Sequence, residues 1–168
     1  YQFINDYTEF GFHRLAINGL NETSNQPICL NGCVLICNGE IYNYKELYEK
    51  EGVFSQTNSD CEIILHLYNK YGIHKTLQLI NGEFAFVLYD QTEKKMFVAR
   101  DPHGVRALYG GYELSSPIND LSFTPKILFA SELKMIYPFS LVNNNIHIEQ
   151  FQPGTLTTLE VCTINNLK

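Results

Sequence analysis

The sequence lacks any apolar stretch long enough to cross a membrane. The run from Phe84 to Tyr89 is among the longest apolar runs, whereas a membrane-spanning helix needs ~18 such residues. The ordered charged, apolar and small-residue regions that mark a signal peptide are also missing. We therefore expect a cytoplasmic protein with no membrane partner.

Cysteine motifs for metal binding and redox chemistry are absent as well. None of the five cysteines belongs to a Cys-x-x-Cys pair, which argues against a zinc ribbon or a thioredoxin-type site. Cys29, Cys33 and Cys37 are evenly spaced, but Asn31-Gly32 between the first two indicates a hairpin, in which the three do not converge. We expect no metal site and interpret the cysteines as small buried apolar residues in a reducing compartment.

Positive charge is scarce. The chain has 12 Lys and Arg against 18 Asp and Glu, a formal net charge of −6, which disfavours nucleic acid or an anionic membrane as the main partner. What is present is typical of a globular domain. The 168 residues are 45% hydrophobic and 13% aromatic, enough to bury one core without disulfides.

The hydrophobic pattern changes from strands to helices and back to strands. Strands are expected over residues 1–4, 8–17, 28–30, 33–37, 83–89, 95–100, 108–114, 127–131 and 155–161. Helices are expected after an Asx cap at Asn43, after a capping box formed by Ser59 and Glu62, over 74–80, and from 132 to a stop at Pro138. Strands that are apolar throughout, with helices between them, predict stacked sheets flanked by helices.

Two segments carry polar groups that a plain hydrophobic core does not need. Arg14 ends an apolar strand, where its planar guanidinium can grip a ligand carboxylate or form an internal salt bridge. Asn38-Gly39-Glu40 follows a buried strand. Gly39 lets a ligand approach its backbone N–H beside the Asn38 amide, as an oxyanion hole requires. The same Asn-Gly dipeptide is also a common turn signal.

Two further segments place charges at the ends of predicted elements. Asp60 follows the Ser59 cap, where the helix dipole favours an acid and where a carboxylate could also face a ligand ammonium. Arg100-Asp101-Pro102-His103-Gly104 closes a strand, and we interpret its charged pair as holding the turn in preference to catalysis by His103. With Arg14 these groups predict an α-amino acid pocket with a reacting carbonyl near Asn38-Gly39, but no nucleophile or base is evident.

Motifs along nearly the whole chain resemble class II glutamine amidotransferase domains, and most closely the N-terminal domains of glutamine-hydrolysing asparagine synthetases. The matching segments, in the family's order, are His13-Arg14-Leu15-Ala16-Ile17, Gln26-Pro27, Asn38-Gly39-Glu40-Ile41-Tyr42-Asn43, Ser59-Asp60-Cys61-Glu62, Asn81-Gly82-Glu83-Phe84-Ala85-Phe86, Arg100-Asp101-Pro102-His103-Gly104 and Phe129-Ala130-Ser131-Glu132-Leu133-Lys134. The resemblance implies the N-terminal-nucleophile hydrolase fold, an α+β four-layer αββα sandwich of two antiparallel sheets, over residues 1–168.

The resemblance also implies L-glutamine as the substrate and assigns roles by matching motif. The glutamine carboxylate would be held by Arg14, with the backbone of Leu15, Ala16, Ile17 and Asn18 completing that wall; Asn38 and Gly39 would form the oxyanion hole, and Glu40 and Asp60 would bind the amino end of the substrate. In the family the nucleophile is a cysteine at the mature N-terminus whose own α-amine serves as base. The glutaminase domain itself uses no cofactor.

In the family, the released ammonia passes to a C-terminal synthetase domain of the same protein, which uses ATP and Mg²⁺ to make asparagine from aspartate. Because this chain begins with Tyr1 and ends at Lys168, we expect the nucleophilic cysteine and the synthetase domain to lie outside it. The 168 residues alone are then not expected to hydrolyse glutamine. Ala107, where the family usually has Pro, and the long 115–126 loop are expected to be neutral.

Two alternative functions remain open from the sequence. One is a non-catalytic structural or regulatory relative that has lost the cysteine, and the other is an amidotransferase that serves a different acceptor. The presence of a leading cysteine in the parent reading frame separates the first, and the motifs of the downstream domain separate the second. The oligomeric state is also open, a homodimer included.

Overall fold

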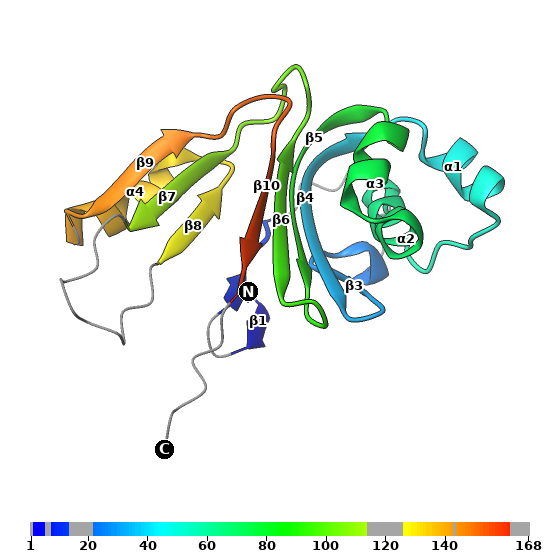
Figure 1. Ribbon diagram of the computed structural model, residues 1–168, viewed down its shortest axis with the longest axis horizontal. Helices are drawn as coiled ribbons and strands as arrows, with labels where there is room; N and C mark the ends of the chain where they lie inside the picture. Colours follow the sequence, from blue (N-terminus) through cyan, green and yellow to red (C-terminus); the bar gives the residue numbers. More distant parts are fainter. Residues whose placement is uncertain (1, 6–7, 14–21, 114–125, 143, 162–168) are drawn as a thin grey trace.

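The computed structural model describes residues 2–5, 8–13, 22–113, 126–142 and 144–161 (Figure 1). In chain order its elements are β1 (Gln2–Asn5), β2 (Thr8–Phe10), the 3₁₀ helix η1 (Glu22–Ser24), β3 (Ile28–Leu30), β4 (Cys33–Ile41), α1 (Tyr44–Glu51), the 3₁₀ helix η2 (Asp60–Glu62), α2 (Ile63–Tyr71), α3 (Ile73–Leu79), β5 (Gly82–Asp90), β6 (Lys95–Arg100), β7 (Tyr109–Glu113), β8 (Ile127–Ala130), α4 (Leu133–Val142), β9 (Ile146–Gln150) and β10 (Leu156–Glu160). The described strands form a five-stranded sheet of order β10-β6-β5-β4-β3, a three-stranded sheet of order β8-β7-β9 and the pair β1-β2.

The Asn31-Gly32 turn joins β3 to β4 as predicted. Both residues have positive φ, 51° and 77°, as the central residues of a type I′ hairpin turn require. The turn sets the register, with Ile28 opposite Leu35. Since β4 runs on to Ile41, its far end has β5 on one side and no strand on the other among the described residues.

Apolar side chains alternate between the two faces of the five-stranded sheet. Leu35 belongs to a cluster that includes Leu67 of α2, so this cluster lies between the sheet and the helices. Its neighbour Val34 belongs to a second cluster, on the opposite face, against which Phe129 of β8 packs. A strand places successive side chains on opposite faces. Both faces of β4 are therefore covered, which confirms the prediction made from the apolar run at 33–37.

The layers follow the order helix, sheet, sheet, helix (Figure 1). Helices α1, α2 and α3 cover one face of the five-stranded sheet, and the three-stranded sheet lies across its other face. Helix α4 contacts β7, β8 and β9, so it forms the outer layer on the far side. Both main sheets are antiparallel throughout. The predicted α+β sandwich is confirmed.

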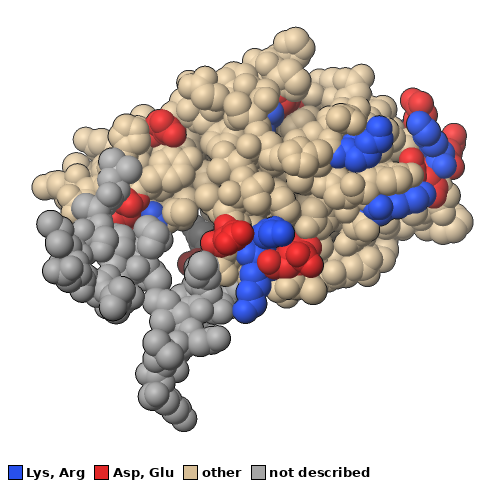
Figure 2. Space-filling view, viewed as in Figure 1, with Lys and Arg blue, Asp and Glu red and all other residues tan. Residues whose placement is uncertain are grey.

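Acidic and basic side chains lie close together over the helical end of the molecule in Figure 2, and no broad patch of one sign covers this face. One contact of this kind is the ion pair between Lys70 Nζ and Glu51 Oε2 at 2.9 Å. The Lys70 side chain is 49% exposed, so water screens this ion pair and it contributes little to stability.

Two predicted helix caps turn out differently. Helix α1 begins after Asn43 as predicted, but the Asn43 side chain does not cap it: Nδ2 donates to Leu79 O at 2.9 Å and Oδ1 accepts from Asn81 N–H at 2.8 Å. Ser59 does cap its helix, accepting from Cys61 N–H at 3.3 Å. The Glu62 half of the predicted capping box is wrong, because that carboxylate binds an earlier loop, described below.

Three other predictions need correction. Helix α4 continues through Pro138 to Val142; proline removes one backbone donor, and the segment around it is exposed to water, which can serve the freed carbonyl. Strand β9 was not predicted, although Ile146 and Ile148 alternate with polar residues as a half-buried strand requires. Cys29 is exposed because β3 is the edge strand of its sheet.

Candidate functional site

The last residues of β4, Asn38 to Ile41, form a strand edge with unusual pairing. Phe84 of β5 lies opposite Gly39 in register, but its backbone groups are used elsewhere. The Phe84 carbonyl accepts from Asp101 N–H at 2.8 Å, and the Phe84 N–H donates to Asp101 Oδ2 at 3.3 Å. In an antiparallel ladder a residue points both backbone groups to the same side. Gly39 and Phe84 therefore form a non-hydrogen-bonded pair, and the Gly39 N–H points away from β5.

Two side chains occupy this edge on either side of Gly39. Before it, Gln26 Oε1 accepts from Cys37 N–H at 2.5 Å while Gln26 Nε2 donates to Cys37 O at 2.9 Å. After it, Asp60 Oδ2 accepts from Ile41 N–H at 2.7 Å. In the described part of the chain no strand adjoins the edge between them, because the pairing with β3 ends further back. The arrangement leaves the Gly39 N–H as an available donor between two fixed neighbours.

Position 39 has no room for a side chain. A Cβ on Gly39 would lie 2.2 Å from Glu83 O and 2.7 Å from Phe84 Cα. Gly82 on the partner strand is equally constrained, since its Cβ would lie 2.1 Å from Glu40 O. Glycine is thus required here by the close approach of β4 and β5, a packing reason additional to the ligand approach inferred from the sequence.

Asn38 and Glu40 project from the sheet face that points toward the second sheet, since they continue the alternation of Val34. The Asn38 side chain is exposed, so its amide can reach a ligand beside the Gly39 N–H. Glu40 lies opposite Glu83, and Arg106 forms an ion pair with Glu83. Glu40 has no ion pair with a described residue, so its negative charge is available to a ligand cation.

Asp60 is buried, with 6% of its surface exposed, at the start of η2. The contacts of the described residues engage its Oδ2: the Ile41 N–H and the Cys61 thiol, the latter at 3.7 Å. Its Oδ1 takes no part in those contacts. The structure therefore places Asp60 at the same end of β4 as Asn38 and Gly39.

Two buried cysteines are not activated thiols: Cys61 beside this edge and Cys33 at the opposite end of β4. Hydrogen bonding to Cys37 and burial raise the pKa of Cys61 well above its ordinary value. Burial and the neighbouring Asp90 raise the pKa of Cys33 to about 11. Because the thiolate is the reactive species, these raised pKa values disfavour reaction of Cys33 and Cys61 at neutral pH. Cys33, Cys37 and Cys61 are buried apolar residues as predicted, and Cys162 lies outside the described residues.

The Arg100-to-Gly104 segment is structural. The buried Arg100 guanidinium donates to the carbonyls of Arg106, Phe151 and Gly104 at 2.6–2.7 Å. The fully buried Asp101 carboxylate accepts from backbone N–H groups, including that of His103 at 2.9 Å. The two charges thus hold the turn as predicted, although each does so through the backbone. The His103 side chain is exposed.

Glu62 organises the loop that precedes η2. Its carboxylate accepts from the N–H groups of Gln56 and Thr57 at 2.7 and 2.6 Å and lies 2.9 Å from His66 Nε2. Burial opposes ionisation, but the hydrogen bonds from His66, Thr57 and Gln56 prevail and lower the pKa of Glu62 to about 2. The loop that carries Asp60 to the β4 edge is therefore anchored by a buried carboxylate.

The predicted site residues separate into two groups. Asn38, Gly39, Glu40 and Asp60 come together at the end of β4. Arg14, Leu15, Ala16, Ile17 and Asn18 lie outside the described residues, so the predicted carboxylate wall stays a prediction. The sequence analysis missed the contacts of Gln26 with the β4 edge and of Asp101 with Phe84 on the β6 side of β5. The Gln26-Pro27 dipeptide just before a strand was the available signal for the first.

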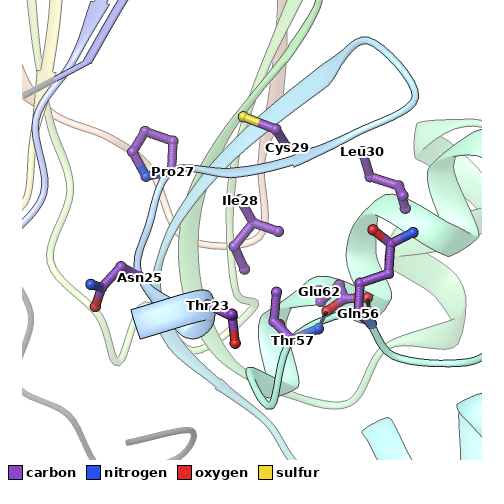
Figure 3. Close-up of a pocket in the computed structure, with 9 residues that line it drawn as sticks. All are labelled: Thr23, Asn25, Pro27, Ile28, Cys29, Leu30, Gln56, Thr57 and Glu62. Carbon is purple, nitrogen blue, oxygen red and sulfur yellow. Dashed lines mark hydrogen bonds between the residues drawn. The ribbon is translucent and has the colours of Figure 1, made fainter. Parts of the chain in front are cut away.

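A small pocket of about 120 Å³ lies between β3, η1 and the loop before η2 (Figure 3). Thr23, Asn25, Pro27, Ile28, Cys29, Leu30, Gln56, Thr57 and Glu62 line it. None of the predicted site residues is among them, and its one carboxylate already binds the backbone of the neighbouring loop. We therefore place the candidate site at the β4 edge and leave this pocket without a role.

Neither a metal site nor a membrane span emerges from the described residues. Among them, no three His, Cys, Asp or Glu side chains gather closely enough to hold a metal ion. No helix over the same residues has the length and apolarity that crossing a bilayer demands.

Comparison with known proteins identifies the family. Residues 2–162 match the model of the glutamine amidotransferase domain, and the chain belongs to this family. A probable glutamine-hydrolysing asparagine synthetase of Acanthamoeba polyphaga mimivirus is 41% identical over 160 residues, which span 94% of this chain and 27% of that protein. The glutamine-hydrolysing asparagine synthetase of Gallus gallus is 46% identical over 111 residues, which span 63% of this chain and 20% of that protein.

Solved structures show the same architecture. Glutamine phosphoribosylpyrophosphate amidotransferase from B. subtilis, complexed with ADP and GMP, matches with a TM-score of 0.59 and 27% identity over 80% of this chain and 30% of its own. A structure described as the allosteric regulatory enzyme of purine biosynthesis matches with a TM-score of 0.62 and 25% identity over 82% of this chain and 30% of its own. The chain spans about a fifth to a quarter of the length of the two asparagine synthetases named above. The predicted fold and family are confirmed.

Proposed function

We propose that this domain releases ammonia from L-glutamine as the glutaminase part of a glutamine-dependent asparagine synthetase. The observation that carries the proposal is the Gly39 N–H, which has no hydrogen-bond partner among the described residues and lies beside the exposed Asn38 amide, at an edge that also presents Asp60 and Glu40. Donors and carboxylates so arranged suit the two ends of one amino-acid substrate: a reacting carbonyl and an ammonium.

The hydrolysis proceeds in two steps. A cysteine thiol, supplied by the N-terminus of the full-length protein, gives its proton to its own α-amine as the sulfur adds to the side-chain amide carbon of glutamine, and the α-amine then passes that proton to the leaving nitrogen. The carbonyl oxygen carries a negative charge in the tetrahedral intermediate, and the Gly39 N–H and the Asn38 amide donate hydrogen bonds to it. Collapse expels ammonia and leaves a glutamyl thioester, which water cleaves to glutamate.

Binding of the α-amino acid end uses the charged groups. Asp60 and Glu40 receive the substrate ammonium; Asp60 keeps one oxygen on the Ile41 N–H and has the other for the ligand. Arg14 binds the substrate carboxylate through its guanidinium, with the backbone of residues 15–18 completing the wall. The ion pair of Glu83 with Arg106 supports this assignment, since it leaves Glu40 as the charge available to the substrate.

Ammonia then reaches a synthetase domain of the same full-length protein, where aspartate is the acceptor. The size and names of the curated relatives support this partner. ATP and Mg²⁺ belong to that domain, which supplies the activation of aspartate. A different acceptor is the alternative, and product analysis with aspartate and ATP–Mg²⁺ separates the two: asparagine forms only in the first case.

The glutaminase proposal is tested in the full-length protein by measuring glutamate and ammonia released from glutamine. Asn38→Ala should lower kcat by about 10²–10³-fold, the usual cost of one oxyanion donor, with little loss of stability because the side chain is exposed. Asn58→Ala, another exposed asparagine, is the matched control and should keep wild-type turnover. A full-length wild type that releases no ammonia would make this a non-catalytic relative.

A further inference from the structure

We propose that Gln26 is a positioning residue that holds the Gly39 N–H in place for the oxyanion, an inference that rests on the proposed glutaminase function. Gln26 acts through the backbone of Cys37. It accepts from the Cys37 N–H at 2.5 Å and donates to the Cys37 carbonyl at 2.9 Å. Its carboxamide thus takes the place that a neighbouring strand would have at this point of the edge.

The two hydrogen bonds control the orientation of successive peptide planes. The Cys37 carbonyl belongs to the planar peptide unit that joins Cys37 to Asn38. The next peptide unit along the chain carries the Gly39 N–H. Beyond it, Asp60 Oδ2 holds the N–H of Ile41 at 2.7 Å. Gln26 and Asp60 therefore fix the chain on both sides of Gly39 while leaving its N–H unpaired among the described residues.

The chemistry of the contact requires a carboxamide. Only Asn and Gln side chains offer both an N–H donor and a carbonyl acceptor on one flat group, which matches the N–H and C=O that Cys37 presents. Glutamate has nearly the same shape but accepts only, so it would set a carboxylate oxygen against the Cys37 carbonyl. Gln26→Glu therefore keeps an acceptor for the Cys37 N–H but replaces the bond to the Cys37 carbonyl with a repulsion between two oxygens, with almost no change in volume.

A small displacement of the Gly39 N–H should affect turnover more than binding. The oxyanion exists only in the tetrahedral intermediate and its transition states, so a misplaced donor weakens those states and leaves the ground-state complex nearly unchanged. Misplacement by about 1 Å can cost on the order of 10²-fold in rate. A residue that served only the stability of the sheet would not lower kcat selectively in this way.

Asn43 provides a matched control. Its carboxamide also makes a donor-and-acceptor pair with the backbone, to Leu79 O at 2.9 Å and from Asn81 N–H at 2.8 Å. That pair lies beyond the end of β4, at the start of β5, and does not include the backbone of Cys37, Asn38 or Gly39. Asn43→Ala therefore removes two hydrogen bonds of the same kind without releasing the peptide planes that flank Gly39.

The experiment compares steady-state glutamine hydrolysis by the full-length wild type, Gln26→Glu, Gln26→Ala and Asn43→Ala, with thermal unfolding of each protein. We expect both Gln26 variants to lower kcat by about ten- to a hundredfold with KM within threefold of wild type. Asn43→Ala should keep kcat within twofold of wild type, even if its melting temperature falls as far as those of the Gln26 variants.

Other results would overturn either the role of Gln26 or the glutaminase proposal itself. Wild-type kcat in Gln26→Glu, or an equal loss of kcat in Asn43→Ala at equal stability, would overturn the role of Gln26 and leave the glutaminase proposal standing. A wild type that releases no ammonia from glutamine would overturn the glutaminase proposal, and the positioning role would fall with it.

Discussion

The Phe84 carbonyl accepts a hydrogen bond from the Asp101 N–H at 2.8 Å, and this contact directs the Phe84 backbone away from β4. Because the Phe84 N–H also donates to the Asp101 carboxylate, Phe84 offers nothing to Gly39, its partner in register. The contact that leaves the Gly39 N–H without a partner in the described part of the chain is thus made two strands away, in the turn that ends β6. This relationship links the stability of a buried turn to the chemistry of an exposed strand edge.

Replacing Asp101 by asparagine should destabilise the domain strongly. The Asp101 side chain accepts from the N–H groups of Phe84, His103 and Val105. An amide would turn its NH₂ group toward some of these donors and leave them unpaired in a buried site. We expect a loss of about 2–4 kcal/mol in the free energy of unfolding, measured by urea denaturation. Glu93→Gln, at an exposed carboxylate, should change the midpoint little, and an equal shift in both variants would contradict this account.

Alanine at Gly39 or at Gly82 should force β4 and β5 apart. The new Cβ would lie 2.2 Å from Glu83 O in the first variant and 2.1 Å from Glu40 O in the second. Since both contacts are with backbone atoms, relief requires a strand shift, and we expect each variant to lose at least ~2 kcal/mol of stability. Thr158→Ala, at an exposed position of β10, is the control for alanine in a strand. A melting temperature for Gly39→Ala equal to that of the control would refute the packing argument.

Asp60→Asn should separate the binding role of this acid from its structural one. Asparagine keeps a carbonyl oxygen for the Ile41 N–H but removes the negative charge, so the β4 edge stays in place while the substrate ammonium loses a partner. We expect KM for glutamine to rise at least tenfold, about 1.4 kcal/mol of binding, with a smaller change in kcat.

Asp90→Asn is the matched control for this charge removal. Asp90 is also buried and also accepts backbone N–H groups, but it lies at the opposite end of β5. Its variant should leave KM for glutamine unchanged. An unchanged KM in Asp60→Asn as well would remove Asp60 from the substrate site.

Glu62 should govern part of the acid unfolding of the domain. Its pKa is lowered from 4.5 to about 2 in the folded protein, so the folded state favours the ionised form. The corresponding stability is present above the unfolded pKa and is lost as the pH falls from about 5 to about 2. Glu62→Gln should cost roughly 2–3 kcal/mol at neutral pH and flatten the stability curve over that range.

The measurement for Glu62 is urea denaturation at a series of pH values between about 2 and 7. Glu46→Gln, on the exposed side of α1, should leave the shape of the curve unchanged. A Glu62→Gln variant that keeps the wild-type slope below pH 5 would show that other carboxylates carry the acid transition.

Local sequence signals predicted those elements whose formation depends on neighbouring residues. The Asn31-Gly32 turn needs only two residues that tolerate positive φ. The Ser59 cap needs only a hydroxyl next to the first turn of the helix. Where a long-range contact competed, the local signal failed. The Asn43 side chain does not cap its helix because it binds the backbone of Leu79 and Asn81, which lie far along the chain.

For the candidate site, the sequence by itself determined which groups are available: a glycine beside an amide at the end of a buried strand, and an acid at the start of a helix. The tertiary structure alone decided how they act. Among the described residues the Gly39 N–H has no hydrogen-bond partner because Phe84 directs its backbone groups to Asp101, and Gln26 and Asp60 bind the β4 edge on either side of Gly39. These contacts join residues from separate segments, and strand pairing across a sheet follows the packing of the whole domain, which no short stretch of sequence encodes.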